Sequence, residues 1–120
     1  MTALVDTSLL AGSLPVEDLG EPWVISVVSV GEQEAGILLA RDDATRAARL
    51  ARLAAVLAEV PIVPVDRTVA ARYGELRAAT GRGATNDLWI AATALAHDFT
   101  LVTADGRQAS LPLVRATLLS

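Results

Sequence analysis

The sequence predicts an α/β fold, a three-layer α/β/α sandwich around a mainly parallel central sheet. Short β-branched apolar runs alternate along the chain with longer segments whose apolar residues recur at helical spacing. Asp6 and Asp105 both fall just after apolar runs, and ligands of parallel sheets bind beyond the carboxyl ends of the strands. Because the chain has 120 residues, 52% of them apolar, we expect a single domain spanning residues 1–120.

The chain opens on a predicted strand, a short helix and a loop. Ala3–Val5 is an apolar run, and residues 6–8 carry Asp, Thr and Ser side chains that cap helices. We therefore expect a short helix through Leu10. Segment 12–22 contains two glycines and two prolines, which indicates a loop.

The stretch from about Ile25 to Leu39 supports two interpretations. Ile25 and the valines after it favour a strand, because β-branched side chains fit extended backbone. Ser26 and Ser29 favour a helix start, and we prefer a helix from Ser26 to about Leu39. Residues 42–59 are clearer, since their leucines recur at helical spacing with arginines between them, and they predict an amphipathic helix.

The middle of the chain predicts one strand and one helix. Pro61–Val65 is a compact β-branched run, which is typical of a strand. Asp66 follows it as the expected N-cap of a helix whose apolar residues, three and four positions apart, share one face. Gly81 and Gly83 are expected to end that helix.

The last third predicts a central helix and two strands. Thr85 is the expected cap of a helix over Asn86–Ala96, which is apolar on several sides. Thr100–Thr103 predicts a buried strand, Asp105 and Gly106 a turn, and Leu113–Ala116 an edge strand.

The composition excludes several kinds of site. Without cysteine the chain has no disulfide, no thiolate nucleophile and no Cys-ligated zinc. Its one histidine, His97, lies near a helix end, where the dipole favours it, and a Ser-His-Asp triad is not expected. The net charge of −4 argues against holding nucleic acid by bulk electrostatics. Without a long uninterrupted apolar stretch, we expect a cytoplasmic protein that stays outside membranes.

Four acidic residues are candidates for chemistry, although three have ordinary structural interpretations. Asp6 is placed to cap a helix, Asp87 lies in the first turn of another, and Asp105 precedes a turn glycine. Glu32 lies among apolar residues, where a carboxylate without a partner is costly. Glu34 lies about 200 degrees further around the same helix, so we expect it to face solvent.

Taken together, the four carboxylates indicate a cation site. Four of them near one sheet edge would repel each other strongly unless a cation lay among them. Hard oxygen ligands suit Mg²⁺ or Mn²⁺. Such ions activate water and stabilise the oxygens of an in-line phosphoryl displacement. The pattern therefore predicts metal-dependent hydrolysis of a phosphodiester.

Three stretches of the chain resemble the PIN-domain ribonucleases, and within them the VapC toxins of bacterial toxin–antitoxin pairs. "LVDTSLL" places Asp6 on the first metal-binding acid of the family, with the small hydroxyl residues Thr7 and Ser8 beside it. "ISVVSVGEQEAGI" places Glu32 on the second acid. "ATNDLWIAATALAHDFTLVTAD" places Asp87 on the third acid and Asp105 on the fourth.

The resemblance implies a PIN-like sandwich and Mg²⁺- or Mn²⁺-dependent endonucleolytic cleavage of RNA. It also implies that Asp6, Asp87 and Asp105 bind the metal, directly or through water. Glu32 would then help to position the metal and the attacking water. All four are the expected catalytic residues.

The resemblance extends to supporting residues and partners. The supporting polar groups that it implies are Thr7, Asn86 and Thr103, the last of which would orient a carboxylate. The implied partners are an RNA substrate, a cognate VapB-like antitoxin and a second copy of the chain in a homodimer. Asp66 also follows a strand but matches no catalytic position of the family, so it keeps its capping interpretation.

Two alternatives come from other functional classes. A receiver-type phosphoacceptor domain has a similar size and also clusters acids around Mg²⁺, but it would carry a lysine late in the chain, and this chain has no lysine. A non-catalytic PIN-type binding module would show no affinity for metal.

Overall fold

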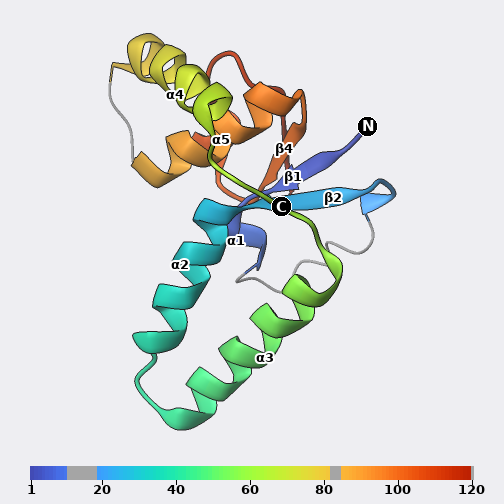
Figure 1. Cartoon of the computed structure of the whole chain (residues 1–120), viewed down its shortest axis with the longest axis vertical. Coiled ribbons are helices and arrows are strands. Elements are labelled where there is room, and N and C mark those ends of the chain that lie inside the picture. The colour runs from blue at the N-terminus through green and yellow to red at the C-terminus, as the bar shows by residue number, and fades with distance from the viewer. Residues whose placement is uncertain (11–18, 82–84, 120) are drawn as a thin grey trace.

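The computed structural model describes residues 1–10, 19–81 and 85–119 (Figure 1). The strands in these ranges are β1 (Ala3–Val5), β2 (Trp23–Ser26), β3 (Ile62–Val63), β4 (Thr100–Thr103) and β5 (Ala116–Leu118). The helices are α1 (Thr7–Leu10), α2 (Val27–Leu38), α3 (Asp43–Glu59), α4 (Arg67–Thr80), α5 (Thr85–His97) and α6 (Gly106–Ala109). Most of the expected loop 12–22, and Gly83, lie outside the described residues.

The strands form one five-stranded sheet in the order β3-β2-β1-β4-β5, and every pair in it is parallel. The predicted parallel sheet is therefore confirmed. From β1 the chain first extends the sheet through β2 and β3, and it then crosses to the other side of β1 to add β4 and β5. This change of direction beside β1 is a topological switch point, where open α/β sheets place their ligand sites.

Hydrophobic residues cover both faces of the sheet, because successive side chains of a strand point to opposite faces. Leu4 and Leu101 pack with α4 and α5 on one face. Val5 and Val102 pack with α1 and the end of α3 on the other. Figure 1 shows α4 and α5 on one side of the sheet, with α2 and α3 extending from the other as an arm. The three-layer architecture is thus confirmed.

The ambiguous stretch around Ser26 contains both of the elements that its residues favour. Trp23–Ser26 is strand β2, which we did not assign, and α2 starts directly after it at Val27. Ser26 ends the strand and caps the helix, since its Oγ accepts a hydrogen bond from the backbone N–H of Val28 at 3.0 Å. The strand is therefore a continuous buried run from Val24 to Ser26, and the helix begins directly after it.

Two predicted strands differ from the structure. β3 is limited to Ile62–Val63 because Pro61 and Pro64 on either side have no N–H to donate to a neighbouring strand. The edge strand was expected over Leu113–Ala116 but begins at Ala116. Leu113 has a φ of 71°, a left-handed conformation that is incompatible with a strand.

The helix ends follow the expected capping residues with one exception. Asp66 accepts from the N–H of Val69 at 3.0 Å, and Gly81 ends α4 in the left-handed conformation. Thr85 was expected as a cap but is the first residue of α5, a shift within the uncertainty of helix boundaries. None of the helices in the described ranges is both long and apolar enough to span a bilayer.

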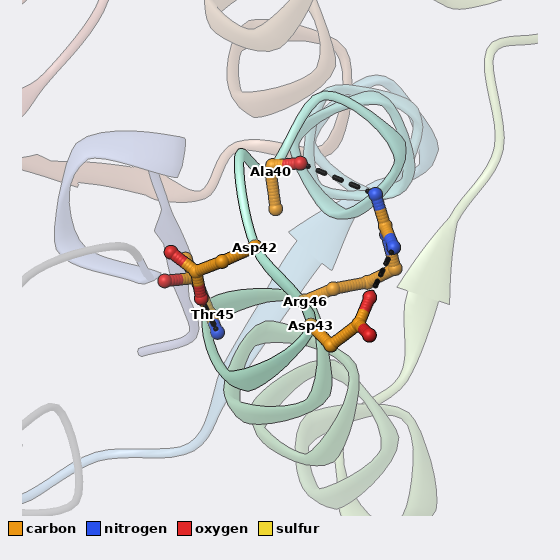
Figure 2. Close-up of polar contacts among 5 residues, drawn as sticks. All are labelled: Ala40, Asp42, Asp43, Thr45 and Arg46. Carbon is orange, nitrogen blue, oxygen red and sulfur yellow. Dashed lines mark hydrogen bonds and ion pairs between the residues drawn. The ribbon is translucent and has the colours of Figure 1, made fainter.

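The corner between α2 and α3 is closed by polar contacts (Figure 2). Asp42 caps α3 by accepting from the N–H of Thr45 at 2.7 Å. The guanidinium of Arg46 donates to the Ala40 carbonyl at 3.2 Å and pairs with Asp43 at 3.1 Å. Arg49 also donates to the Gly36 carbonyl, at 2.6 Å. Arg46 and Arg49 therefore support the structure of this arm.

Candidate active site

Asp6 lies at the switch point of the sheet. It follows β1 directly, and its backbone N–H continues the pairing with β4 by donating to the Val102 carbonyl at 2.8 Å. Its side chain is only 4% exposed. A carboxylate this buried requires hydrogen-bond donors, and two hydroxyl groups supply them.

Thr103 and Ser8 are these donors. The Oγ1 of Thr103, at the end of β4, donates to Asp6 Oδ2 at 2.7 Å, and Ser8 Oγ donates to the same oxygen at 2.9 Å. Thr103 Oγ1 also accepts from the backbone N–H of Asp105 at 3.0 Å, and Ser8 Oγ accepts from that of Ala104 at 3.1 Å. The two hydroxyls therefore tie the segments after β1 and β4 together and fix both acids.

Glu32 is positioned by Thr7, the first residue of α1. Its Oε1 accepts from Thr7 Oγ1 at 2.8 Å, and the same hydroxyl lies 2.8 Å from Ser29 Oγ. Ser29 is fully buried one turn before Glu32 on α2. Glu32 is half-buried, less than the apolar sequence around it suggested, and the Thr7 hydroxyl is the partner that it needs.

Asp87 and Asp105 are linked through the short helix α6. Asp105 caps α6, because its Oδ1 accepts from the backbone N–H of Arg107 at 2.9 Å. One turn later, the side chain of Gln108 is buried and its Nε2 donates to the backbone carbonyl of Asp87 at 2.8 Å. Asp87 lies in the first turn of α5. Asp105 was expected in a turn with Gly106, but Gly106 instead begins α6 and Asp105 is its N-cap.

The four acids act on one another electrostatically. Burial raises the pKa of Asp87 above the ordinary value of 3.8, and the negative charges of Asp6, Asp105 and Glu32 raise it further. The positive charge of Arg107 opposes them. The fold therefore brings the other three predicted carboxylates within electrostatic range of Asp87.

The chemistry of this donor set fits a hard divalent cation. All four groups are carboxylates, and the neighbouring hydroxyl groups add further oxygen donors. In the part of the chain that the structure describes, no three such side chains converge on a single ion. Mg²⁺ commonly binds through one or two carboxylates and keeps several water molecules, which this more open arrangement allows.

The remaining predicted residues lie outside this network. Asn86 is exposed beside Asp87, and its side chain makes no hydrogen bond to the described residues. Asp66 caps α4, and Glu34 is exposed, as expected. His97 is the last residue of α5 and stacks on Phe99 with ring centroids 5.2 Å apart.

Sequence reasoning missed two residues of the network. Ser29 was considered only as a helix cap, and Gln108 was not considered. Ser29 could have been found, because it lies one turn from Glu32 on the same helix face. Gln108 gives no such signal, since its contact with Asp87 joins residues 21 positions apart.

Comparison with known proteins decides the family. A protein-family model described as "PIN domain" matches residues 4–113 of this chain. The chain belongs to the PIN-domain family. Ribonuclease VapC4 of Mycobacterium tuberculosis is 35% identical to it over 119 residues, which cover 92% of this chain and 91% of the relative. Ribonuclease VapC5 of the same organism is 34% identical over 117 residues, which cover 90% and 86%.

A solved structure of this PIN-domain family agrees. It is that of VapBC-5 from Mycobacterium tuberculosis, a member of the VapBC family of toxin–antitoxin systems. The match has a TM-score of 0.85 and 34% sequence identity, and it covers 98% of both chains. The chain is therefore a member of the VapC ribonucleases, and PIN ribonucleases are generally metal-dependent. The resemblance seen in the sequence is confirmed, which decides against a receiver domain.

Proposed function

We propose that this VapC-family PIN domain is the toxin of a type II toxin–antitoxin system and cleaves RNA endonucleolytically with Mg²⁺ or Mn²⁺. The observation that carries this proposal is the carboxylate cluster, by which we mean Asp6, Glu32, Asp87 and Asp105. Asp87 is repelled by the other three acids at the switch point of the sheet. We further propose that residues 1–120 form a single catalytic domain that acts in the cytoplasm.

The proposed catalytic roles combine the family resemblance with the contacts of the acids. Asp6, Asp87 and Asp105 hold the cation, directly or through water, and Thr103 fixes the orientation of Asp6. Glu32, oriented by Thr7, accepts a proton from the attacking water or positions it. When bound, the cation would activate that water and offset charge on the phosphate oxygens. Asn86, which is exposed beside Asp87, would contact the substrate.

The proposed partners are a VapB-like antitoxin and a second copy of this chain. The relative VapBC-5 belongs to a family of toxin–antitoxin systems. Apolar side chains are also exposed on the arm of α2 and α3, where Leu38, Leu39 and Leu50 are 76%, 79% and 55% exposed. Exposed apolar patches commonly mark protein contacts, which supports a protein partner.

Cleavage of total RNA by charge-neutralised variants tests this function. We expect the wild type to cleave with Mg²⁺ and to be inactive with EDTA. Asp6→Asn and Asp105→Asn should lower the cleavage rate by at least about 100-fold, since losing even an outer-shell partner of a metal typically costs 10–100-fold. Mapping the cut ends would then identify the target RNA.

Asp66→Asn is the matched control, because Asn also caps helices well and Asp66 caps α4. It should cleave like the wild type. If Asp6→Asn cleaves at the wild-type rate with an unchanged circular dichroism spectrum, the catalytic assignment is wrong. The absence of both metal affinity and cleavage would indicate the non-catalytic binding module.

A further inference from the structure

A cavity of about 800 Å³ opens directly beside the carboxylate cluster. Asp87 and Asp105 line one part of it, and the rest is formed by the end of α4, by α6 and by the residues that follow α6. The cavity is therefore continuous with the proposed catalytic centre. Its volume lies in the range of sites that hold small organic molecules, so one nucleotide of a bound RNA would fit into it.

The walls of the cavity are partly apolar. Leu88 is 1% exposed, Leu111 is half-buried against the same core, and Pro112 extends the apolar wall beside it. The hydroxyl hydrogens of Thr80 and Ser110 are already donated to backbone carbonyls, at 2.9 and 2.8 Å. The cavity thus offers apolar surface more than free hydrogen-bond donors, which suits the flat face of a nucleobase.

Arg107 supplies a positive charge at this cavity. Its side chain is exposed and lines the cavity, and its charge acts on Asp87. Arg46, Arg72 and Arg115 pair with acidic side chains. In the described ranges the guanidinium of Arg107 has no ion pair or hydrogen bond. It is therefore available to an anion from outside the chain, in a protein whose net charge is −4.

We propose that this cavity binds the nucleotide next to the scissile phosphate of single-stranded RNA. Arg107 contacts the phosphate of that nucleotide, and Leu111 and Pro112 contact its base. Apolar side chains can pack against an unpaired base, and arginine binds phosphate through charge-assisted hydrogen bonds. The inference rests on the proposed ribonuclease function and adds to it a residue that contacts substrate outside the carboxylate cluster.

The salt dependence of RNA binding tests the phosphate contact. Binding of a fluorescent single-stranded oligoribonucleotide is measured by anisotropy between 50 and 300 mM KCl, with every variant built on Asp6→Asn to prevent cleavage. Each phosphate contact on a single strand contributes about 0.7 to the slope of log K against log salt. We expect Arg107→Ala to bind more weakly and to reduce the magnitude of the slope by about 0.7, and Arg107→Lys to keep the slope.

Arg72→Ala is the matched control, because it removes the same charge from an exposed arginine that pairs with Glu75 and does not line the cavity. It should keep the parental slope. Leu111→Ser should bind RNA about fivefold or more weakly, as expected for the loss of one base contact, with an unchanged slope. An Arg107→Ala slope equal to that of the Asp6→Asn parent would overturn the proposed subsite.

Cleavage of the same oligonucleotide separates this inference from the proposed function. If the protein with native Asp6 cleaves it with Mg²⁺ but Arg107→Ala on that background keeps full kcat/KM, the function stands and the subsite is wrong. If no cleavage occurs while Arg107→Ala still lowers the salt slope, the subsite stands and the catalytic function is wrong.

Discussion

Thr103 is the residue on which the geometry of the cluster depends. It is fully buried, and its hydroxyl donates to Asp6 Oδ2 at 2.7 Å while accepting from the N–H of Asp105 at 3.0 Å. One hydroxyl thus connects two acids that are far apart in the sequence. Because it partly compensates the burial of Asp6, it supports stability and the positions of the catalytic groups together.

Thr103→Val tests this double role, since valine has the shape of threonine without its hydroxyl. We expect the free energy of unfolding to fall by about 1–3 kcal/mol, because Asp6 and the Asp105 N–H each lose a partner. RNA cleavage should fall by about 10–100-fold, as for other groups that orient metal ligands. Urea unfolding and single-turnover cleavage measure the two effects. Thr103→Ser keeps the hydroxyl and should retain most activity; wild-type cleavage by Thr103→Val would refute the orienting role.

The short helix α6 is the element that sets the distance between Asp87 and Asp105. Asp105 caps its first turn, and Gln108 in the same helix donates to the Asp87 carbonyl at 2.8 Å. We therefore regard Gln108 as a positioning residue. Methionine fills a similar volume and lacks only this donor. The free energy of unfolding of Gln108→Met should therefore be about 1 kcal/mol lower than that of the wild type.

The metal dependence of Gln108→Met distinguishes positioning from general stability. We expect the Mg²⁺ concentration for half-maximal cleavage, and the Kd for Mn²⁺ measured by calorimetry, to rise by about tenfold. At saturating Mn²⁺ the kcat of Gln108→Met should approach the wild-type value, because the Gln108 amide acts through its hydrogen bond to the Asp87 carbonyl. A variant that is destabilised but has wild-type Mn²⁺ affinity would show that Gln108 has only a structural role.

The elements differ in how well the sequence predicts them. β4 and α3 were predicted closely because their patterns are local, a buried run in one and helical spacing in the other. β2 was missed because a strand and a helix follow each other without a loop at Ser26. The predicted position of β5 was wrong because the left-handed backbone of Leu113 cannot be predicted from a leucine in the sequence. The carboxylates came from a motif, but the contact of Gln108 depends on tertiary packing.

At the scale of the whole molecule, the carboxylate cluster stores electrostatic repulsion in the fold. Burial and the charges of Asp6, Asp105 and Glu32 raise the pKa of Asp87, so its ionised form is less favourable in the folded protein than in the unfolded chain. Functional sites commonly sacrifice stability in this way. A divalent cation at the cluster would relieve the repulsion, which links the pH, the metal and the stability of the entire domain.

The sign of this linkage gives a prediction for Asp87→Asn. The ordinary pKa of an aspartate is 3.8, and the pKa of Asp87 in the folded protein is higher. Between these two values, the folded protein binds more protons than the unfolded chain. The contribution of Asp87 to stability therefore falls as the pH rises through this window. In EDTA we expect Asp87→Asn to be more stable than the wild type at pH 7 and the difference to shrink toward pH 4, as measured by urea unfolding.

Mg²⁺ should reverse the order of the two proteins. At 100 times its Kd, a ligand that binds only the folded state adds about 2.7 kcal/mol to stability, and the wild type should gain more than Asp87→Asn because the variant lacks one ligand. Asp66→Asn, changed at a helix cap away from the cluster, should gain as much as the wild type. A stability difference between Asp87→Asn and wild type that is independent of both pH and Mg²⁺ would mean that Asp87 does not share a cation site with its neighbours.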